Sequence, residues 1–152
     1  MPEASFAIRA MTAVDATAVA RWRYDGIYAF YDWDQDEDDL AELLDPSEWG
    51  RRYFAVDRDA SLAGFLVVKL EDGVAEIGLG LRPDLTGRGL GVELVATGLR
   101  FAEHLGAEGC TLAVAAFNRR AITVYERAGF VEVERYRHRT NGGIHDFVRM
   151  RR

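Results

Sequence analysis

The feature that most constrains this chain is a glycine-rich turn between an expected strand and an expected helix. Residues 74–81 are largely apolar and predict a strand, which Pro83 ends because proline has no N–H to donate. Three glycines follow within five residues, and apolar side chains then recur at helical spacing from residue 90. This arrangement aims a row of backbone N–H groups outward from a helix N-terminus, where they can bind phosphate oxygens.

Two common nucleotide-binding turns do not fit the spacing. The glycines at 87, 89 and 91 read G-x-G-x-G rather than G-x-G-x-x-G, and the next expected strand, residues 109–115, has no acidic residue at its end. A Walker A loop needs a lysine directly after its second glycine, whereas the single lysine of this chain is Lys69. The turn therefore belongs to neither class.

The turn resembles the acetyl-CoA pyrophosphate loop of the GNAT superfamily of N-acetyltransferases, whose pattern is Q/R-x-x-G-x-G/A. Thr86 stands here at the position of the usual Gln or Arg. A second motif of that family follows at the right distance, so the resemblance covers residues 76–130 closely and the whole length loosely. The second motif reads Asn118-x-x-Ala121-x-x-x-Tyr125-Glu126-x-x-Gly129-Phe130.

The pattern of the whole chain predicts strand, two helices, three strands, helix, strand, helix and two strands. The first helix is expected over residues 13–24, and Asn141 and the two glycines after it predict the turn of a final hairpin. The resemblance implies an α/β (α+β) GNAT acyl-CoA N-acyltransferase fold. This is a mixed, mostly antiparallel sheet with splayed central strands and flanking helices, expected as one domain over residues 1–152.

The resemblance also implies where acetyl-CoA, as co-substrate, would bind. Its diphosphate would lie on the N–H groups of the loop, and its pantetheine arm would pair like a strand beside residues 79–81. Gly78 and Gly80 inside a strand indicate a bulge or a close backbone approach, and an N–H near residues 80–81 would face the thioester oxygen. The expected cofactor-binding residues are Leu79, Gly80, Leu81, Gly87, Arg88, Gly89, Leu90, Gly91, Val92 and Asn118.

Two residues are expected to carry the chemistry of an N-acetyltransferase. Tyr125 lies seven residues after Asn118, two turns along one helix face, and by resemblance its hydroxyl protonates the leaving CoA thiolate. Glu76 is the expected base, because an alkyl ammonium with a pKa of about 10.4 must lose a proton before it attacks. Ribosomal-protein-type N-terminal acetyltransferases place a base Glu where this chain has Ala113, which weakens that alternative.

Residues 24–39 interleave aromatic rings with carboxylates. In the GNAT fold this region supplies much of the acceptor surface, so rings and carboxylates here would suit an ammonium group. Tyr28 and Tyr31 are the expected acceptor contacts; alternatively, the rings pack a corner and the acids are solvated. The acceptor stays open, with a small amine slightly favoured over a protein amine. A non-catalytic CoA-binding or regulatory module of the same fold is the alternative from another class.

Composition limits the partners and the location. A net charge of −6 does not indicate binding to nucleic acid, and it favours a cationic substrate. No apolar run is long enough to span a bilayer. The single Cys110 and the lack of a signal peptide indicate a reducing cytoplasm. The histidines show no metal-ligand spacing, so no metal is expected. The expected partners are acetyl-CoA, an amine and, through the edge of the final hairpin, a second copy in a homodimer.

Overall fold

The computed structural model describes residues 5–152, which form a seven-stranded sheet in the order β1-β2-β3-β4-β5-β7-β6. The β4–β5 pair is parallel and the other neighbouring pairs are antiparallel. The expected mixed, mostly antiparallel sheet flanked by helices is therefore confirmed, as is the order of its elements.

The strands are β1 Phe6–Ala10, β2 Tyr53–Arg58, β3 Ser61–Glu71, β4 Val74–Leu81, β5 Gly109–Ala115, β6 Val131–Thr140 and β7 Gly143–Arg151. The α-helices are α1 Ala13–Ala20, α2 Glu37–Leu43, α3 Gly91–His104 and α4 Arg119–Arg127. The short 3₁₀ helices are η1 Gly26–Tyr31, η2 Trp33–Gln35, η3 Pro46–Glu48 and η4 Pro83–Leu85.

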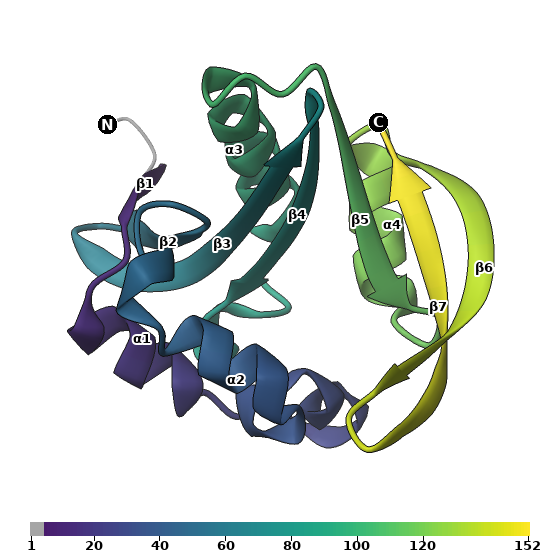
Figure 1. Ribbon diagram of the computed structural model, residues 1–152, viewed down its shortest axis with the longest axis horizontal. Helices are drawn as coiled ribbons and strands as arrows, with labels where there is room; N and C mark the ends of the chain where they lie inside the picture. The colour runs from purple at the N-terminus through teal and green to yellow at the C-terminus, as the bar shows by residue number, and fades with distance from the viewer. Residues whose placement is uncertain (1–4) are drawn as a thin grey trace.

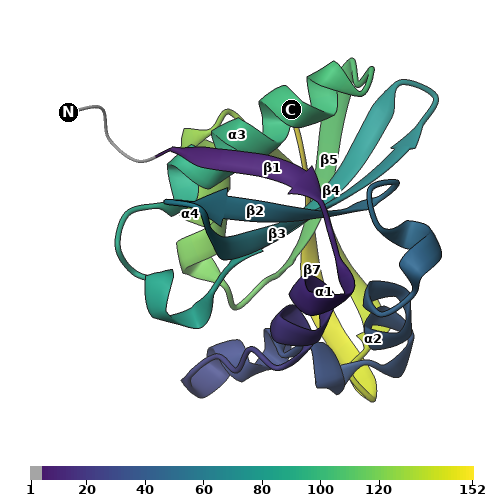
Figure 2. The ribbon, with the colours of Figure 1, turned by 90° about the vertical axis from the view of Figure 1, so that its left-hand side faces the viewer.

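Two apolar clusters lie on opposite faces of the sheet, because successive side chains of a strand point to opposite sides. On β3, Leu66 and Val68 join the larger cluster, to which α3 and α4 contribute, whereas Val67 joins a smaller one with Val19 of α1 and Leu43 of α2. Figures 1 and 2 show α1 and α2 on the side of the sheet away from α3. The two faces are thus covered by different halves of the chain.

The central strands β4 and β5 diverge, which confirms the expected splay. They pair only from Val74 with Gly109 to Glu76 with Thr111, although β4 continues to Leu81. Each strand stays paired on its other side, β4 with β3 and β5 with β7. Figure 1 shows the two ribbons close together at one end and separated at the other. The opening therefore lies inside the sheet.

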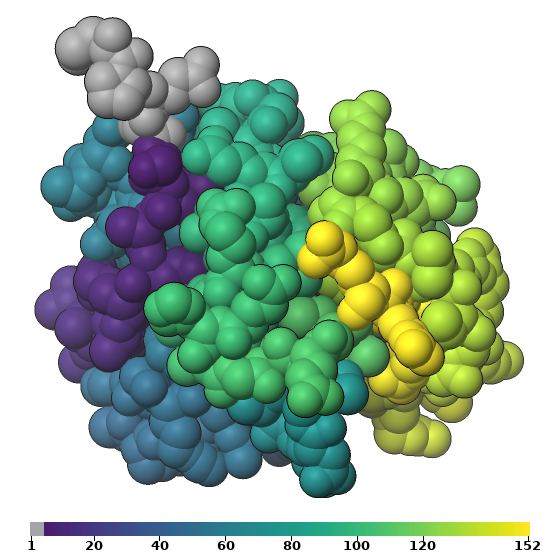
Figure 3. Space-filling view, turned by 90° about the horizontal axis from the view of Figure 1, so that it is seen from above, coloured from purple at the N-terminus to yellow at the C-terminus, as the bar shows by residue number. Residues whose placement is uncertain are grey.

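At the end where β4 and β5 are still paired, the C-terminus continues the ladder between β5 and β7. The N–H of Cys110 donates to the carbonyl of Arg152, and the N–H of Arg152 donates to the carbonyl of Cys110, both at 2.9 Å. Figure 3, which looks down on this end, shows the C-terminal residues beside the segment that leads into β5. Cys110 is buried, and this burial raises the pKa of its thiol. Among residues 5–152 no helix is long and apolar enough to cross a membrane.

The first helix is shorter than its sequence pattern predicts. It ends at Ala20 rather than at residue 24, and Gly26, with φ +59°, begins η1. The main-chain N–H of Tyr24 donates to Asp32 at 2.9 Å, and its hydroxyl donates to the carbonyl of Leu81 at 2.7 Å. These tertiary contacts hold Tyr24 outside the helix, which apolar spacing alone does not reveal.

Asp15 is expected to stabilise the start of α1. Its buried carboxylate accepts from Arg9 at 2.6 Å and from the N–H of Thr12 at 2.9 Å. The hydrogen bond from Arg9 is the main cause that lowers the pKa of Asp15 below its usual value. The stabilisation is therefore complete above the unfolded-state pKa of about 3.9 and is lost as the pH falls through the lower folded-state pKa.

We expect Asp15→Asn to lower the free energy of unfolding by about 1–2 kcal/mol at neutral pH, and by less near pH 3. Urea denaturation at the two pH values measures this difference. Asp57→Asn is the matched control, because Asp57 also binds Arg9, at 2.7 Å, but caps no helix. If both variants lose equal stability, the cap formed by Asp15 contributes nothing.

Candidate active site

The divergence of β4 and β5 opens into a cavity of about 810 Å³, here called the central cleft. Its wall combines the outer part of β4, the glycine-rich loop, the first turns of α4 and side chains from residues 24–39. The structure thus brings most of the sequence-predicted site residues to one cavity. Those that line it are Glu76, Leu79, Gly80, Leu81, Gly87, Gly89, Leu90, Gly91, Asn118 and Tyr125, with Tyr28 and Tyr31.

Two sequence-predicted residues do not line the central cleft. Arg88 and Val92 are absent from its wall, although both belong to the segment that carries the loop into α3. That Arg88 and Val92 contact the cofactor therefore stays a prediction, which rests on their place in the loop and in the first turn of α3.

The glycine-rich loop presents free N–H groups. Gly87 and Gly89 adopt φ of +74° and +77°, a conformation that residues with a side chain disfavour. Residues of positive and negative φ in alternation turn successive N–H groups toward a common point. Leu90, at the start of α3, provides no side-chain cap. The N–H groups of residues 87–93 donate to no described residue. They form a concave set of donors at the positive end of a 14-residue helix.

The edge of β4 that faces the divergence adds further free donors. The N–H of Arg82 donates to the carbonyl of Ala63 on β3 at 2.7 Å, and N–H groups along an antiparallel strand alternate in direction. The N–H of Gly80 therefore points to β3, opposite Phe65, whereas those of Leu79 and Leu81 point toward the divergence. Of the two candidates for the thioester-facing N–H, at residues 80 and 81, only that of Leu81 points toward the divergence, and the N–H of Leu79 points the same way.

Gly80 is required by close packing against the neighbouring strand β3 rather than by a bulge. A Cβ at Gly80 would lie 2.6 Å from the ring of Phe65, and a Cβ at Gly64 would lie 2.6 Å from the carbonyl oxygen of Gly80. The register between β3 and β4 runs without a shift from Gly64 to Glu71. The bulge that a strand glycine can indicate is therefore not present here, and Gly80 gives the cleft a wall without a side chain.

The aromatic segment that contains η1 bridges the two separated strands. Tyr24 donates its hydroxyl to Leu81 of β4 at 2.7 Å, and the hydroxyl of Tyr31 accepts the N–H of Ala115 of β5 at 3.2 Å. Asn141 fixes the segment further by donating to the carbonyl of Phe30 at 2.7 Å. Residues 24–31 thus span the open end of the divergence and set its width.

Both expected acceptor residues already have protein partners. The guanidinium carbon of Arg120 lies over the ring of Tyr28, 4.2 Å from its centroid, so that face of the ring already carries a cation. The Tyr31 hydroxyl is engaged by Ala115, and burial raises its pKa, opposed by the neighbouring Asn118 side chain. Both residues thus have a structural role in holding the site together, and their expected contact with the acceptor stays a prediction.

Asn118 and Tyr125 lie on α4 at the divergence. Asn118 is 9% exposed, and its side-chain oxygen caps the helix by accepting the N–H of Ala121 at 3.1 Å. Tyr125 packs edge-to-face on Phe130, with ring centroids 5.9 Å apart, and its hydroxyl has no hydrogen-bond partner among residues 5–152. Burial raises the pKa of Tyr125, so the phenol keeps its proton at neutral pH. The arrangement leaves a protonated donor at the cleft wall.

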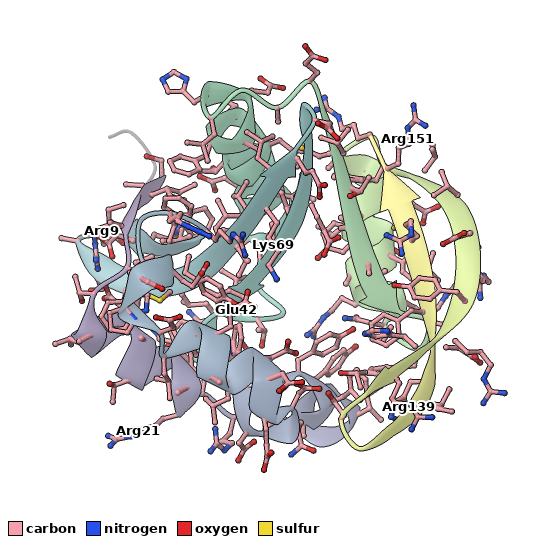
Figure 4. The ribbon with its side chains drawn as sticks, in the orientation of Figure 1. Arg9, Arg21, Glu42, Lys69, Arg139 and Arg151 are labelled. Carbon is pink, nitrogen blue, oxygen red and sulfur yellow. The ribbon has the colours of Figure 1, made fainter. Side chains whose placement is uncertain are left out.

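The part of the wall formed by β3, β4 and α2 carries two of the four carboxylates that line the cleft, Glu76 and Asp39. Glu76 is the last residue of β4 that pairs with β5, and it forms no ion pair with the described residues. Lys69 lies opposite Glu76 on β3, but its ammonium contacts Glu42 of α2 at 2.8 Å. Figure 4 labels Lys69 and Glu42. Asp39 also lines the cleft, and burial, followed by repulsion from Asp36 and Glu42, raises its pKa.

The sequence pattern missed several cleft residues. Tyr24 and Asp39 are two among many aromatic and acidic residues of their segment, and nothing in the spacing distinguishes them. Lys69 could have been noticed as the single lysine of the chain. The sequence allows Arg119 and Arg120 to reach phosphates, but an exposed Arg at a helix start is usually solvated, and the spacing does not distinguish the two. Within the described part of the chain no group of three or more His, Cys, Asp or Glu side chains could hold a metal ion.

The family model described as "Acetyltransferase (GNAT) family" matches residues 15–130. Mycothiol acetyltransferase of Streptomyces coelicolor is 38% identical over 128 residues, which cover 82% of this chain and 40% of that protein. Mycothiol acetyltransferase of Saccharopolyspora erythraea is 38% identical over 132 residues, or 78% of this chain and 41% of that protein. The chain thus spans about 40% of the length of these curated relatives.

Solved structures share the fold. A structure of spermidine N-acetyltransferase from Vibrio cholerae in complex with CoA and spermine has a TM-score of 0.78 at 23% identity, covering 97% of this chain and 95% of that one. A putative phosphinothricin N-acetyltransferase has a TM-score of 0.71 at 20% identity, covering 97% and 98%. At this level of identity, the similarity shows a shared fold only.

Proposed function

The chain belongs to the GNAT family of acetyltransferases, and we propose that it transfers the acetyl group of acetyl-CoA to a primary amine by direct attack in a ternary complex. The observation that carries this proposal is the continuity of the central cleft. Its lining includes the loop residues Gly87, Gly89 and Gly91 together with Tyr125 and Glu76. A candidate anion site, a candidate acid and a candidate base thus share one cavity.

The proposed binding mode uses donors that have no partner within the described chain. The N–H groups of the glycine-rich loop would hold the diphosphate, and the N–H groups of Leu79 and Leu81 would pair with the pantetheine arm. The N–H of Leu81 would then stabilise negative charge on the thioester oxygen as the amine attacks. These donors are fixed before binding, because the β3 ladder and α3 hold them in place.

The proposed proton transfers use Glu76 and Tyr125. The amine nitrogen bonds to the thioester carbon, and the carbon–sulfur bond breaks. Glu76 accepts the proton that the amine loses, directly or through water, and Tyr125 donates its hydroxyl proton to the departing thiolate. The raised pKa of Tyr125 keeps this proton available across the neutral range.

We propose a small primary amine as the acceptor rather than an amine of a protein. Two observations support this choice: the proteins named above are a mycothiol acetyltransferase and a spermidine N-acetyltransferase by name, and side chains from residues 24–39 line the cleft. The carboxylates of Glu76 and Asp39 in the wall favour an ammonium group. A homodimer formed through the terminal hairpin remains part of the proposal.

Binding of CoA is the first test. We expect isothermal calorimetry to detect CoA with a dissociation constant in the micromolar to millimolar range, in line with ordinary substrate affinities. Thiol release from acetyl-CoA, measured with a panel of small amines, then separates an enzyme from a non-catalytic CoA-binding module. Absence of CoA binding by the intact chain would overturn the proposed function at its first step.

A further inference from the structure

Arg120 is a cation at the wall of the central cleft that no carboxylate of the described residues neutralises. It lies in the first turn of α4, directly after Arg119, and its side chain is exposed. It forms no ion pair within residues 5–152, unlike Arg82 at the other end of the loop, which binds Asp84 at 2.6 Å. A free guanidinium facing a cavity is available to an anionic ligand.

The guanidinium of Arg120 is directed at the glycine-rich loop. Its Nη1 atom lies 4.0 Å from the position that a Cβ of Gly87 would occupy. Thr86, which also lines the cleft, donates its hydroxyl to the carbonyl of Pro83 at 2.7 Å. Arg127 also lines the cleft, but it lies at the C-terminal end of α4, whereas Arg120 lies in the first turn of that helix and reaches Gly87.

The ring of Tyr28 fixes this position. The guanidinium carbon of Arg120 lies 4.2 Å from the ring centroid, within the range of a cation–π contact. Tyr28 belongs to η1, which the hydrogen bonds of Tyr24 and Tyr31 tie to both separated strands. A guanidinium held on a rigid ring loses less conformational freedom when it binds an anion. The stacked pair is therefore preorganised for a ligand in the loop.

We propose that Arg120 is the side-chain ligand of the cofactor diphosphate, and that Tyr28 is a positioning residue for Arg120 rather than an acceptor contact. The inference rests on the proposed function, because it needs CoA in the central cleft. The loop N–H groups and the guanidinium together enclose the anion: the amides point from α3 and the guanidinium approaches from α4. Bidentate hydrogen bonds from a guanidinium suit the oxygens of a phosphate.

Calorimetry with Arg120→Gln and the matched Arg119→Gln tests the ligand role. Both variants remove one charge from the same helix end, but Arg119 is not part of the cleft wall. We expect Arg120→Gln to raise the dissociation constant of CoA about 10- to 100-fold, and Arg119→Gln to change it less than about threefold. Equal effects of the two variants would overturn the inference.

Shortened ligands identify which phosphate is bound. The Arg120→Gln loss should persist with 3′-dephospho-CoA, which keeps the diphosphate, and should vanish with S-acetylpantetheine, which lacks it. A loss confined to CoA would assign Arg120 to the 3′-phosphate and overturn the diphosphate assignment. Failure of the unsubstituted chain to bind CoA would instead refute the proposed function, so the two failures are distinguishable.

Tyr28 is tested by comparing two substitutions. Tyr28→Phe keeps the aromatic face and should leave CoA affinity within about threefold, whereas Tyr28→Leu should weaken it about 3- to 20-fold. The Tyr28→Leu, Arg120→Gln double variant should bind no more weakly than Arg120→Gln alone. A further loss in the double variant would show that Tyr28 contacts the ligand independently, against the positioning role. Circular dichroism checks that each variant retains its fold.

Discussion

Replacing Tyr125 with phenylalanine is expected to lower kcat by about a hundredfold while leaving the affinity for acetyl-CoA within about threefold. The hydroxyl has no hydrogen-bond partner among the described residues, so its loss leaves no protein group unsatisfied. The ring remains able to pack on Phe130, so the fold should be retained. Steady-state thiol release gives kcat, and calorimetry gives the affinity.

The pH profile separates an acid from a merely structural tyrosine. Burial raises the pKa of Tyr125, so the hydroxyl stays protonated from about pH 6 to pH 10 and the loss in Tyr125→Phe should be constant over this range. Tyr136→Phe serves as control, because Tyr136 packs on Phe147 but does not line the central cleft. A kcat for Tyr125→Phe within threefold of the unsubstituted chain would remove Tyr125 from the mechanism.

Glu76→Gln is expected to lower kcat/KM about a hundredfold at pH 7, with the deficit shrinking as the pH rises. At pH 7 only about one in a thousand molecules of a simple alkyl amine is neutral, so a base is needed to generate the attacking form. Near pH 10 the free amine is abundant without help. The measurement is kcat/KM for one amine from pH 6.5 to 10 in both proteins.

Two further variants assign the base. Glu71→Gln makes the same change of charge at the exposed end of β3, away from the cleft wall, and should leave the profile unchanged. Asp39→Asn tests a second carboxylate of the wall, one whose pKa is raised mainly by burial and further by repulsion from Asp36 and Glu42. Parallel profiles for Glu76→Gln and the unsubstituted chain would exclude Glu76, and a pH-dependent loss in Asp39→Asn would then move the role to α2.

Much of the fold could be predicted because its signals are local. The turn of the last hairpin follows from Asn141 and Gly142, which adopt φ of +52° and +73°. The side chain of Asn118 caps α4, and Thr12 and Asp15 cap α1, each through atoms within three residues of one another. The splay of β4 and β5 came from a family resemblance, since no local feature states where a parallel pairing ends.

In the candidate site, too, the features with local signals could be predicted and the tertiary contacts could not. The glycine-rich loop, the strand before it and the helix after it could be predicted, because glycine, proline and apolar spacing act within a few residues. Three contacts are visible only in the folded chain: Arg120 reaches the loop at Gly87, its guanidinium lies over the ring of Tyr28, and Tyr24 donates to Leu81. Each of these contacts joins residues that lie tens of positions apart. Their meeting depends on sheet register and on the angle at which two strands separate, which a one-dimensional pattern of side chains does not encode.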